Sequence, residues 1–431
     1  MAPLSTLPAV AQPPLSRTRL CAWTAAALII IFGILIRIVP WTGFTTAGFD
    51  EVLYRSYVLT LDRGGLESYP IVCQLYLEDQ KEPGAITKLP PTRFLYIYCG
   101  WIAKRILFGD APPVYAKAPN FAQTDPALLA LHRTASVFSS LLFIVAGICA
   151  WRMLGTASGL GVLALAACSP TQIHLAQHAF VDGFLAFWAT MCVWLLWENL
   201  RTPNHRGWLA ALGACLALMV LTKENAFFVY IGLCGLVGIN RWARFGEVTR
   251  GLLLIMVAGP LAGLSVLMNL AGGTDVFIAI YQLLVSNAEK LTYAIRTGDG
   301  PWHRYFVDLM IVSPVVLCLA IGGLFTSLKT SRPLLYLSAF VGFTYVVMCN
   351  IKFGMNLRYA TIWELPICAL ATAQVCELAR PFGKRASFVA ILLVIGLCAY
   401  SLRQYVIFFV DNHLYELISE ALLRAVKIVK P

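Results

Sequence analysis

The chain has 431 residues, of which 59% are hydrophobic and only 13% are charged. A soluble domain carries about a quarter charged residues, so this chain lacks the polar surface that would cover a water-soluble particle. The composition therefore predicts a polytopic helical membrane protein. The net charge of +11 is explained by basic loops between apolar segments, and we infer no nucleic-acid binding from it.

The apolar residues occur in blocks of membrane-spanning length. "GLLLIMVAGPLAGLSVLMNL" (251–270) carries no charge, and a bilayer is crossed by a helix of about 20 residues. Backbone groups in lipid must pair within their own segment, which favours helices. We expect an all-α fold with about eleven transmembrane helices in one domain over 20–410. The expected spans are 20–40, 134–151, 157–176, 181–197, 208–222, 225–240, 251–270, 306–328, 333–350, 360–376 and 387–402.

Basic residues in the short loops indicate the orientation. When the N-terminus is placed in the cytoplasm, every inside loop carries Lys or Arg, as the positive-inside rule requires. Residues 1–19 are then a disordered cytoplasmic N-terminus, with no convincing cleavage site after the first apolar stretch. These basic residues are Arg17, Arg19, Arg152, Arg201, Arg206, Arg241, Arg244, Arg250, Lys329, Arg332, Arg380, Lys384 and Arg385.

Two long loops and a tail remain on the extracytoplasmic side. Residues 42–128 form the first loop, which we expect to contain short surface helices, and residues 271–305 form a later one. The apolar stretch 93–108 is interrupted by two basic residues, and a span there would turn every later basic loop outward. Residues 411–431 are expected to be an amphipathic C-terminal tail, in which "LYELISEALLRAVKIVK" (414–430) has apolar residues at helical spacing and is expected to form a helix on the membrane surface.

The thirteen cysteines fall mostly inside the apolar segments, so we predict no disulfide framework. A bridge between Cys73 and Cys99 remains an alternative.

An acidic pair in "AGFDEVLYRSYVLTL" (47–61) is the first candidate for chemistry. Further charged residues lie at the extracytoplasmic ends of other spans, where water-filled cavities tolerate them. The acidic pair is Asp50 and Glu51. The others are Lys88, Asp182, Lys223, Glu224, His303, Arg304, Lys352 and Arg358.

Structural roles are open for each of these residues. Asp50 and Glu51 can favour the first turn of a surface helix, and Asp182 can cap its span. Lys223 and Glu224 fit an interface anchor and its partner. Lys352 and Arg358 can extend to lipid headgroups. His174 and His178, spaced i and i+4, fit a metal pair or hydrogen-bonded polar residues.

Taken in order, several short motifs resemble the C-type glycosyltransferases of the protein O-mannosyltransferase and lipid A aminoarabinose transferase kind. The resemblance runs from about residue 20 to about residue 375. One departure is that Thr87 stands where the aminoarabinose branch has an acid, with Leu89 inserted before Pro90 and Glu82 out of register. The motifs are "IRIVPWTGFTTAGFDEVLY", "KLPPTRFLYIYCGWIAKRILFG", "HRTASVFSSLLF", "SPTQIHLAQHAFVDGFLAFW", "LTKENAFF", "GPWHRYFVDL" and "LRYATIWELP".

The resemblance implies an inverting enzyme that takes a hexosyl or pentosyl sugar from a polyprenyl phosphate and gives it to a lipid, glycan or protein. Asp50 would act as the general base, and Glu51 would orient its neighbours. Asp182 would hold sugar hydroxyls or the acceptor. Cations would bind the donor phosphate: Lys88, Lys223, Lys352 and Arg358. Sugar or acceptor contacts would come from Tyr54, Tyr57, His178 and His303.

The sequence indicates no required cofactor, and it leaves open whether the enzyme uses a divalent metal. The resemblance places the enzyme in a plasma membrane with the active site on the extracytoplasmic side, and the compact form without extra domains favours a bacterial inner membrane. A transporter or flippase for a lipid-linked or anionic solute is the main alternative. A structural subunit that has lost the chemistry is another. Charge gathered at one face favours surface chemistry over alternating access, since transporters usually place polar residues near the midplane.

Overall fold

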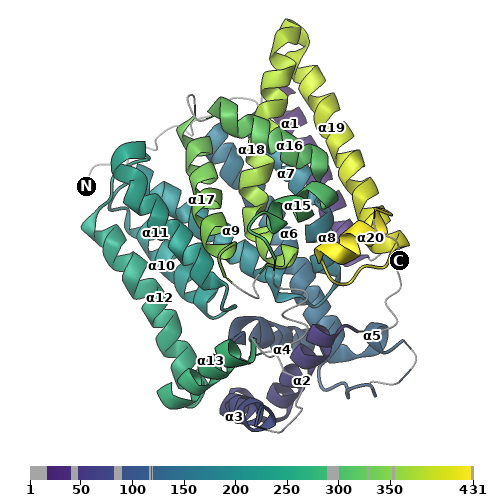
Figure 1. Ribbon diagram of the computed structural model, residues 1–431, viewed down its shortest axis with the longest axis vertical. Coiled ribbons are helices and arrows are strands. Elements are labelled where there is room, and N and C mark those ends of the chain that lie inside the picture. The colour runs from purple at the N-terminus through teal and green to yellow at the C-terminus, as the bar shows by residue number, and fades with distance from the viewer. Residues whose placement is uncertain are drawn as a thin grey trace, which may run out of the picture.

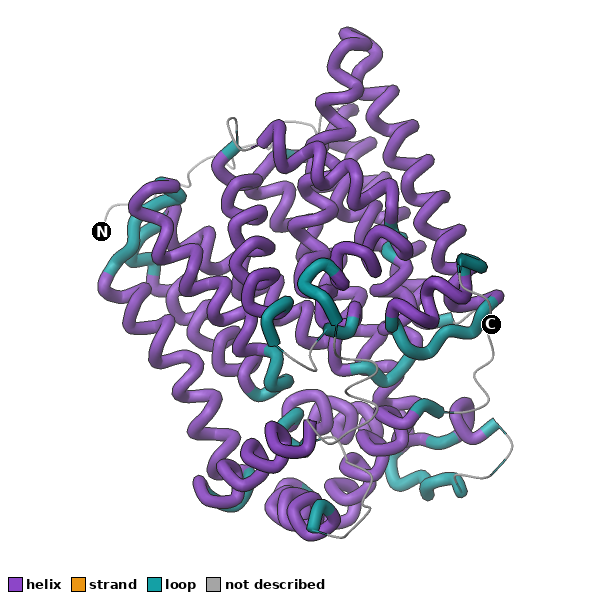
Figure 2. The backbone as a smooth tube through the Cα atoms, in the orientation of Figure 1, coloured by secondary structure: helices purple, strands orange, loops and turns teal. Residues whose placement is uncertain are grey.

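The computed structural model describes residues 17–39, 47–81, 90–115, 118, 120–288, 300–327, 331–351 and 355–428. Within these residues the chain consists of helices joined by loops, and no strand is present (Figure 2). The predicted all-α class is therefore confirmed.

A helix stands at each of the eleven expected spans (Figure 1). The bundle helices are α1 (Arg17–Ile38), α6 (Pro126–Leu154), α7 (Thr156–Ala167), α8 (Pro170–Gln177), α9 (Val181–Arg201), α10 (Arg206–Val220), α11 (Ala226–Ala243), α12 (Arg250–Leu270), α15 (Arg304–Val312), α16 (Pro314–Ser327), α17 (Arg332–Met348), α18 (Glu364–Ala379) and α19 (Ala386–Tyr405).

Fewer than eleven of these helical segments are long and apolar enough to cross a membrane on their own. Among the described residues, six helical stretches are long and apolar enough to cross a membrane, or seven if the bent α7–α8 pair is one span. Shorter apolar helices include α10, α16 and α17. The number eleven thus describes apolar segments, and the count of true crossings stays a prediction.

Two of the expected spans are broken at a Ser-Pro pair. The segment 157–176 divides at Ser169–Pro170, where α7 and α8 meet with a 52° bend. The segment 306–328 divides at Ser313–Pro314 between α15 and α16. Proline removes a backbone donor and clashes with the preceding turn, and it pushes the residue before it out of the helical region.

Arg37 stabilises the first of these breaks from inside the bundle. Its guanidinium donates to the carbonyl oxygens of Ala166 and Ala167, both at 2.9 Å. These carbonyls lie at the C-terminal end of α7, where the last backbone acceptors of a helix lack regular helical partners. The guanidinium also donates to Ser139 Oγ at 2.9 Å, so the end of α1 is tied to α6 and α7. The break lets α8 redirect the chain toward the start of α9.

The first long loop is a helical layer at one end of the bundle (Figure 1). It contains α2 (Phe49–Gly64), η1 (Leu66–Ser68), α3 (Tyr69–Asp79), α4 (Phe94–Phe108) and α5 (Phe121–Thr124). These helices share a second core with residues of α6, α9 and α13 (Thr274–Ala288). The stretch 93–108 is a short helix whose Lys104 is buried against Asp62.

The C-terminal tail differs from its expected form. Of the described residues after 411, only Ser419–Ala425 (α20) are α-helical, and residues 412–418 form no helix. The helix expected from residue 414 onward was therefore wrong in its first part, because backbone carbonyls of this stretch pair with distant residues. The Tyr415 carbonyl contacts His174, and Leu417 O accepts from Leu357 N.

All thirteen cysteines are free thiols, so the Cys73–Cys99 bridge is not formed.

Candidate active site

The site centres on an ion pair between residues 308 positions apart. Arg358 Nη1 donates to Asp50 Oδ2 at 3.1 Å. Asp50 lies in the first turn of α2, where the helix dipole favours a negative charge. Arg358 comes from η2 (Leu357–Trp363), the short helix before α18, and its guanidinium lies 4.7 Å from the Phe180 ring centroid.

Asp182 links this arginine to a second cation. Lys223 Nζ donates to Asp182 Oδ1 at 2.6 Å, and Arg358 Nε lies 3.8 Å from Asp182 Oδ2. The Lys223 ammonium also sits 4.3 Å from the Tyr359 ring centroid. Burial lowers the pKa of Lys223, and the Asp182 carboxylate opposes that shift. Because both carboxylate oxygens face cations, Asp182 positions Lys223 and Arg358. Its predicted contact with sugar or acceptor stays a prediction.

A third carboxylate reaches Arg358 from the tail. Glu416 Oε2 lies 3.8 Å from Arg358 Nη2 and accepts from Asn356 Nδ2 at 3.4 Å. Sequence reasoning missed Glu416, because the tail pattern suggested only an amphipathic surface helix. We call the set Asp50, Asp182, Lys223, Arg358 and Glu416 the Arg358 cluster.

A neighbouring ion pair was also missed. Arg93, just before α4, donates through Nη2 and Nε to the two oxygens of Glu224. Its Nη1 donates to Tyr54 Oη at 2.5 Å. Burial acts to lower the pKa of Arg93, but Glu224 and Tyr54 outweigh it and raise that pKa. Arg93 lay within the quoted "KLPPTRFLYIY" motif, so its position there was the available signal.

The two tyrosines of α2 are core residues. Tyr54 is 0% exposed and packs edge-on against Tyr96, while Tyr57 is 7% exposed. Stacking on a sugar needs an open ring face, which neither ring has. Their expected role as sugar contacts is therefore corrected to packing, with the Tyr54 hydroxyl holding Arg93.

Glu51 is an anchor that joins three parts of the chain. Its carboxylate accepts from the backbone N–H of Gly48 at 2.6 Å and of Ala179 at 2.8 Å. It also contacts His132 Nε2 at 2.8 Å and His178 Nδ1 at 3.3 Å. Burial acts to raise the pKa of Glu51, but the two histidines outweigh it and hold that pKa well below the usual range. At 1% exposure, Glu51 positions α2 and cannot reach a substrate.

His174 in α8 and His178, the residue directly after α8, belong to this packing as well. His178 contacts Glu51, and its ring lies 5.1 Å from that of Tyr415. His174 stacks on Phe409 at 4.1 Å. Among the described residues, no group of three or more His, Cys, Asp or Glu side chains could hold a metal ion. His178 is thus a buried partner of Glu51, which corrects its expected contact with sugar or acceptor.

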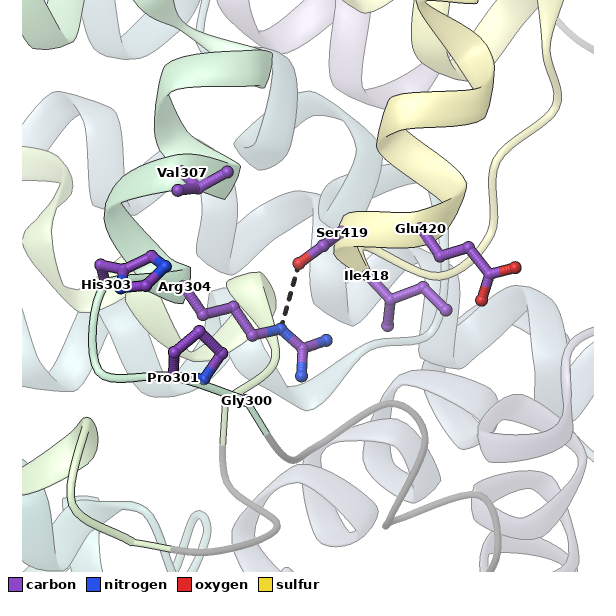
Figure 3. A pocket seen from close by; sticks show the side chains of 8 residues that line it. All are labelled: Gly300, Pro301, His303, Arg304, Val307, Ile418, Ser419 and Glu420. Carbon is purple, nitrogen blue, oxygen red and sulfur yellow. Dashed lines mark hydrogen bonds between the residues drawn. The ribbon is translucent and has the colours of Figure 1, made fainter. Parts of the chain in front are cut away.

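A hollow of about 340 Å³ lies beside the cluster, between the starts of α15 and α20 (Figure 3). Arg304 Nε donates to Ser419 Oγ at 3.1 Å across it. His303 lines its edge, and its predicted contact with sugar or acceptor stays a prediction. Lys88 and Lys352 lie outside the described residues.

Comparison with known proteins places this geometry in a wider setting. The sequence model of the family described as Dolichyl-phosphate-mannose-protein mannosyltransferase matches residues 117–279, which is less than half of the chain. Among solved structures, the oligosaccharyltransferase of Archaeoglobus fulgidus in the apo form superimposes with a TM-score of 0.60 at 12% identity, covering 89% of this chain. ArnT from Cupriavidus metallidurans bound to undecaprenyl phosphate gives a TM-score of 0.53 at 15% identity, covering 94% of this chain and 74% of ArnT.

This chain has the C-type glycosyltransferase fold. The resemblance inferred from the motifs is thereby confirmed at the level of the fold. The chain spans 55% of the length of the Archaeoglobus fulgidus enzyme. It also spans 55% of the Archaeoglobus fulgidus AglB in complex with an inhibitory peptide and a dolichol-phosphate. That structure superimposes with a TM-score of 0.57 at 12% identity and covers 90% of this chain. No curated protein matches the sequence.

Proposed function

We propose that this C-type fold carries an inverting glycosyltransferase, which moves a sugar from a polyprenyl-phosphate donor to an acceptor on the extracytoplasmic face. The Arg358 cluster supports this proposal most directly. It joins a partly exposed carboxylate to a buried guanidinium at one end of the bundle. Two proteins of similar fold bind polyprenyl phosphates in their solved structures: ArnT binds undecaprenyl phosphate and the archaeal AglB binds a dolichol-phosphate.

Arg358 is the donor-phosphate ligand in this proposal. A guanidinium contacts a phosphate with two parallel N–H bonds, where a lysine supplies a point charge. Lys223 lies in the same cluster through Asp182 and adds positive charge. Both cations stabilise the negative charge that develops on the leaving phosphate. Asp182 keeps the two cations at fixed positions before the donor arrives.

Asp50 is the general base. The acceptor oxygen or nitrogen attacks the anomeric carbon and gives its proton to the Asp50 carboxylate. The bond between the anomeric carbon and the phosphate oxygen breaks, and polyprenyl phosphate leaves with the bonding electrons. One displacement on the face opposite the phosphate inverts the anomeric configuration. Asp50 suits this role because its side chain is 15% exposed, whereas that of Asp182 is 3% exposed.

The charge pattern supports the proposed orientation. Basic residues gather at the bundle end opposite the cluster, where Arg332 Nη1 donates to the carbonyl oxygen of Arg244 and Arg152 pairs with Glu198. Because basic loops face the cytoplasm, the cluster then faces the extracytoplasmic side of a plasma membrane, with the N-terminus inside.

The test is turnover by the purified protein in lipid nanodiscs. Undecaprenyl phosphate carrying a radiolabelled hexose or pentose is supplied with candidate lipid, glycan and peptide acceptors, and release of undecaprenyl phosphate is measured. We expect sugar transfer with inverted configuration, which NMR of the product would establish. A flippase would instead move the labelled lipid across liposomes without breaking the sugar–phosphate bond, and that result would overturn the proposal.

A further inference from the structure

The nonhelical residues 412–418 form what we call the C-terminal strap. Its backbone is held at both sides of the Arg358 cluster. The carbonyl oxygen of Tyr415 lies 3.0 Å from His174 Nε2, and that of Leu417 accepts from the Leu357 N–H at 3.4 Å. Just after the strap, Ser419 is held by Arg304 (Figure 3). The strap therefore runs from α8, past η2, to α15.

One side chain of the strap covers the start of α2. A Cβ atom added to Gly48 would lie 1.9 Å from the Tyr415 ring, so ring and backbone touch two residues before Asp50. The Tyr415 ring also packs against Phe180, with centroids 4.9 Å apart. Its hydroxyl is buried and has no hydrogen-bond partner among the described residues. Such a group costs free energy, so the closed strap is less stable than a fully satisfied one.

The carboxylate of Glu416 stands where an incoming anion would be repelled. Each of the three nitrogens of Arg358 faces a carboxylate, because Nε faces Asp182, Nη1 faces Asp50 and Nη2 faces Glu416. The Arg358 cluster holds two cations and three carboxylates, so its formal charge is one negative unit. Like charges disfavour one another at close range. A phosphate that binds Arg358 must therefore displace one carboxylate.

Glu416 is the carboxylate with the weakest attachment. Asp182 is fixed by Lys223 at 2.6 Å and is 3% exposed, and Asp50 is hydrogen-bonded at 3.1 Å from a helix. Within the part of the chain that the structure describes, the polar contacts of Glu416 are no shorter than 3.4 and 3.8 Å, and its side chain is 22% exposed. It also belongs to a segment that no helix constrains.

We propose that the donor phosphate replaces Glu416 on Arg358, and that the C-terminal strap is a cover displaced by the donor. This inference rests on the proposed function, because it assumes that Arg358 receives the donor phosphate. In the donor-free state Glu416 occupies the phosphate position and Tyr415 covers the start of α2. When the phosphate binds, Glu416 is released, the strap moves away and Asp50 becomes accessible to the acceptor.

The first test measures binding of undecaprenyl phosphate to protein in nanodiscs. Glu416→Gln removes the competing charge, so we expect tighter binding by about threefold to tenfold, a modest factor because the ion pair is long and partly solvated. Glu420→Gln is the matched control. Glu420 lies one helical turn along, pairs with Arg424 and is exposed, so its variant should bind like wild type. Undecaprenol, which lacks the phosphate, should not distinguish the variants.

The second test uses the unaltered protein, so it does not depend on how a variant folds. Hydrogen–deuterium exchange of the peptide covering 412–418 should accelerate on adding undecaprenyl phosphate and should not change with undecaprenol. Slower or unchanged exchange, or equal or weaker binding by Glu416→Gln, overturns the strap inference while the proposed function stands. If undecaprenyl phosphate fails to bind both wild type and Glu416→Gln, the proposed function itself is overturned.

Discussion

Asp50 and Glu51 are adjacent carboxylates in one helical turn, yet their surroundings differ in kind. Glu51 is 1% exposed and accepts two backbone N–H groups besides its two histidine contacts. Asp50 forms an ion pair with Arg358 at 3.1 Å, and its side chain remains partly exposed. Successive helical residues point about 100° apart, so one side chain turns into the packed layer and the other faces the cluster.

This difference in surroundings gives the two carboxylates different roles, with Glu51 as a structural anchor and Asp50 as a candidate for chemistry. A carboxylate with every oxygen engaged cannot accept a proton from a substrate without breaking its own contacts. A carboxylate paired with a single arginine can do so once that arginine engages a phosphate. Glu51 therefore fixes where α2 begins, and Asp50 uses that fixed position. The predictions below test this division of roles.

Asp50→Asn should have the largest effect on turnover. The amide keeps the size and polarity of the carboxylate but cannot take a proton, so we expect sugar transfer to fall about 10² to 10⁴-fold. Thermal unfolding and undecaprenyl phosphate binding should change little, because Asn is about as good as Asp near a helix start. Asp110→Asn, in an exposed ion pair with Arg105, is the control. Near wild-type turnover would remove Asp50 from the mechanism.

Arg358→Ala should weaken donor binding as well as turnover. The variant loses the two-pronged phosphate contact and leaves three carboxylates facing one another, so kcat/KM should fall about 10 to 100-fold. Isothermal binding of undecaprenyl phosphate separates this defect from that of Asp50→Asn. Unchanged affinity with lost turnover would show that Arg358 does not hold the phosphate.

Glu51→Gln should act on stability more than on rate. An amide can keep one acceptor oxygen but loses the charge that both histidines face, so unfolding should be easier by about 2–4 kcal/mol. Turnover per folded molecule should fall less than tenfold, which is milder than for Asp50→Asn. Thermal melting in detergent checks the first value, and activity normalised to folded protein checks the second. A rate defect equal to that of Asp50→Asn would contradict the comparison.

The stabilisation from Glu51 should also depend on pH. Its folded pKa lies well below the unfolded value of 4.5, so its contribution is present above pH 4.5 and is lost as pH falls through the folded pKa. The melting difference between wild type and Glu51→Gln should therefore be constant near neutral pH and shrink in acid. A difference that widens as pH falls would reverse the assigned sign.

Tyr54→Phe should have the smallest effect. It removes the hydroxyl that accepts from Arg93 and leaves the packed ring, so stability should drop by about 1 kcal/mol and turnover should change less than about twofold. A large loss of sugar affinity would restore the stacking role that burial argues against.

Hydropathy predicted the helices because span length and lipid exclusion act within each segment. It did not predict the breaks before Pro170 and Pro314 as breaks, because prolines are tolerated within many membrane helices. Among site residues, Asp50, Asp182, Lys223 and Arg358 were found because charges at span ends are conspicuous in an apolar chain.

Other parts of the site depend on tertiary packing alone. Glu416 lies in a tail whose pattern resembles a surface helix, and nothing local indicates that it reaches Arg358. Arg93 and Glu224 pair across 131 positions, which no local pattern encodes. For Tyr54 and Tyr57 of α2 the sequence suggested a functional role that the structure does not support. Their helical spacing relative to Asp50 suggested a face that binds a ligand, but both rings are buried in the core.

The 308 positions between Asp50 and Arg358 also set an order of events during biosynthesis. Contacts of such long sequence separation form only after the intervening chain has been made, and they slow folding. The acidic half of the pair emerges early, while its basic partner and the strap emerge at least 308 residues later. A nascent chain that has not reached Arg358 and the strap therefore holds no assembled Arg358 cluster, and phosphate-bearing lipids meet a competent site only after these later segments have been inserted.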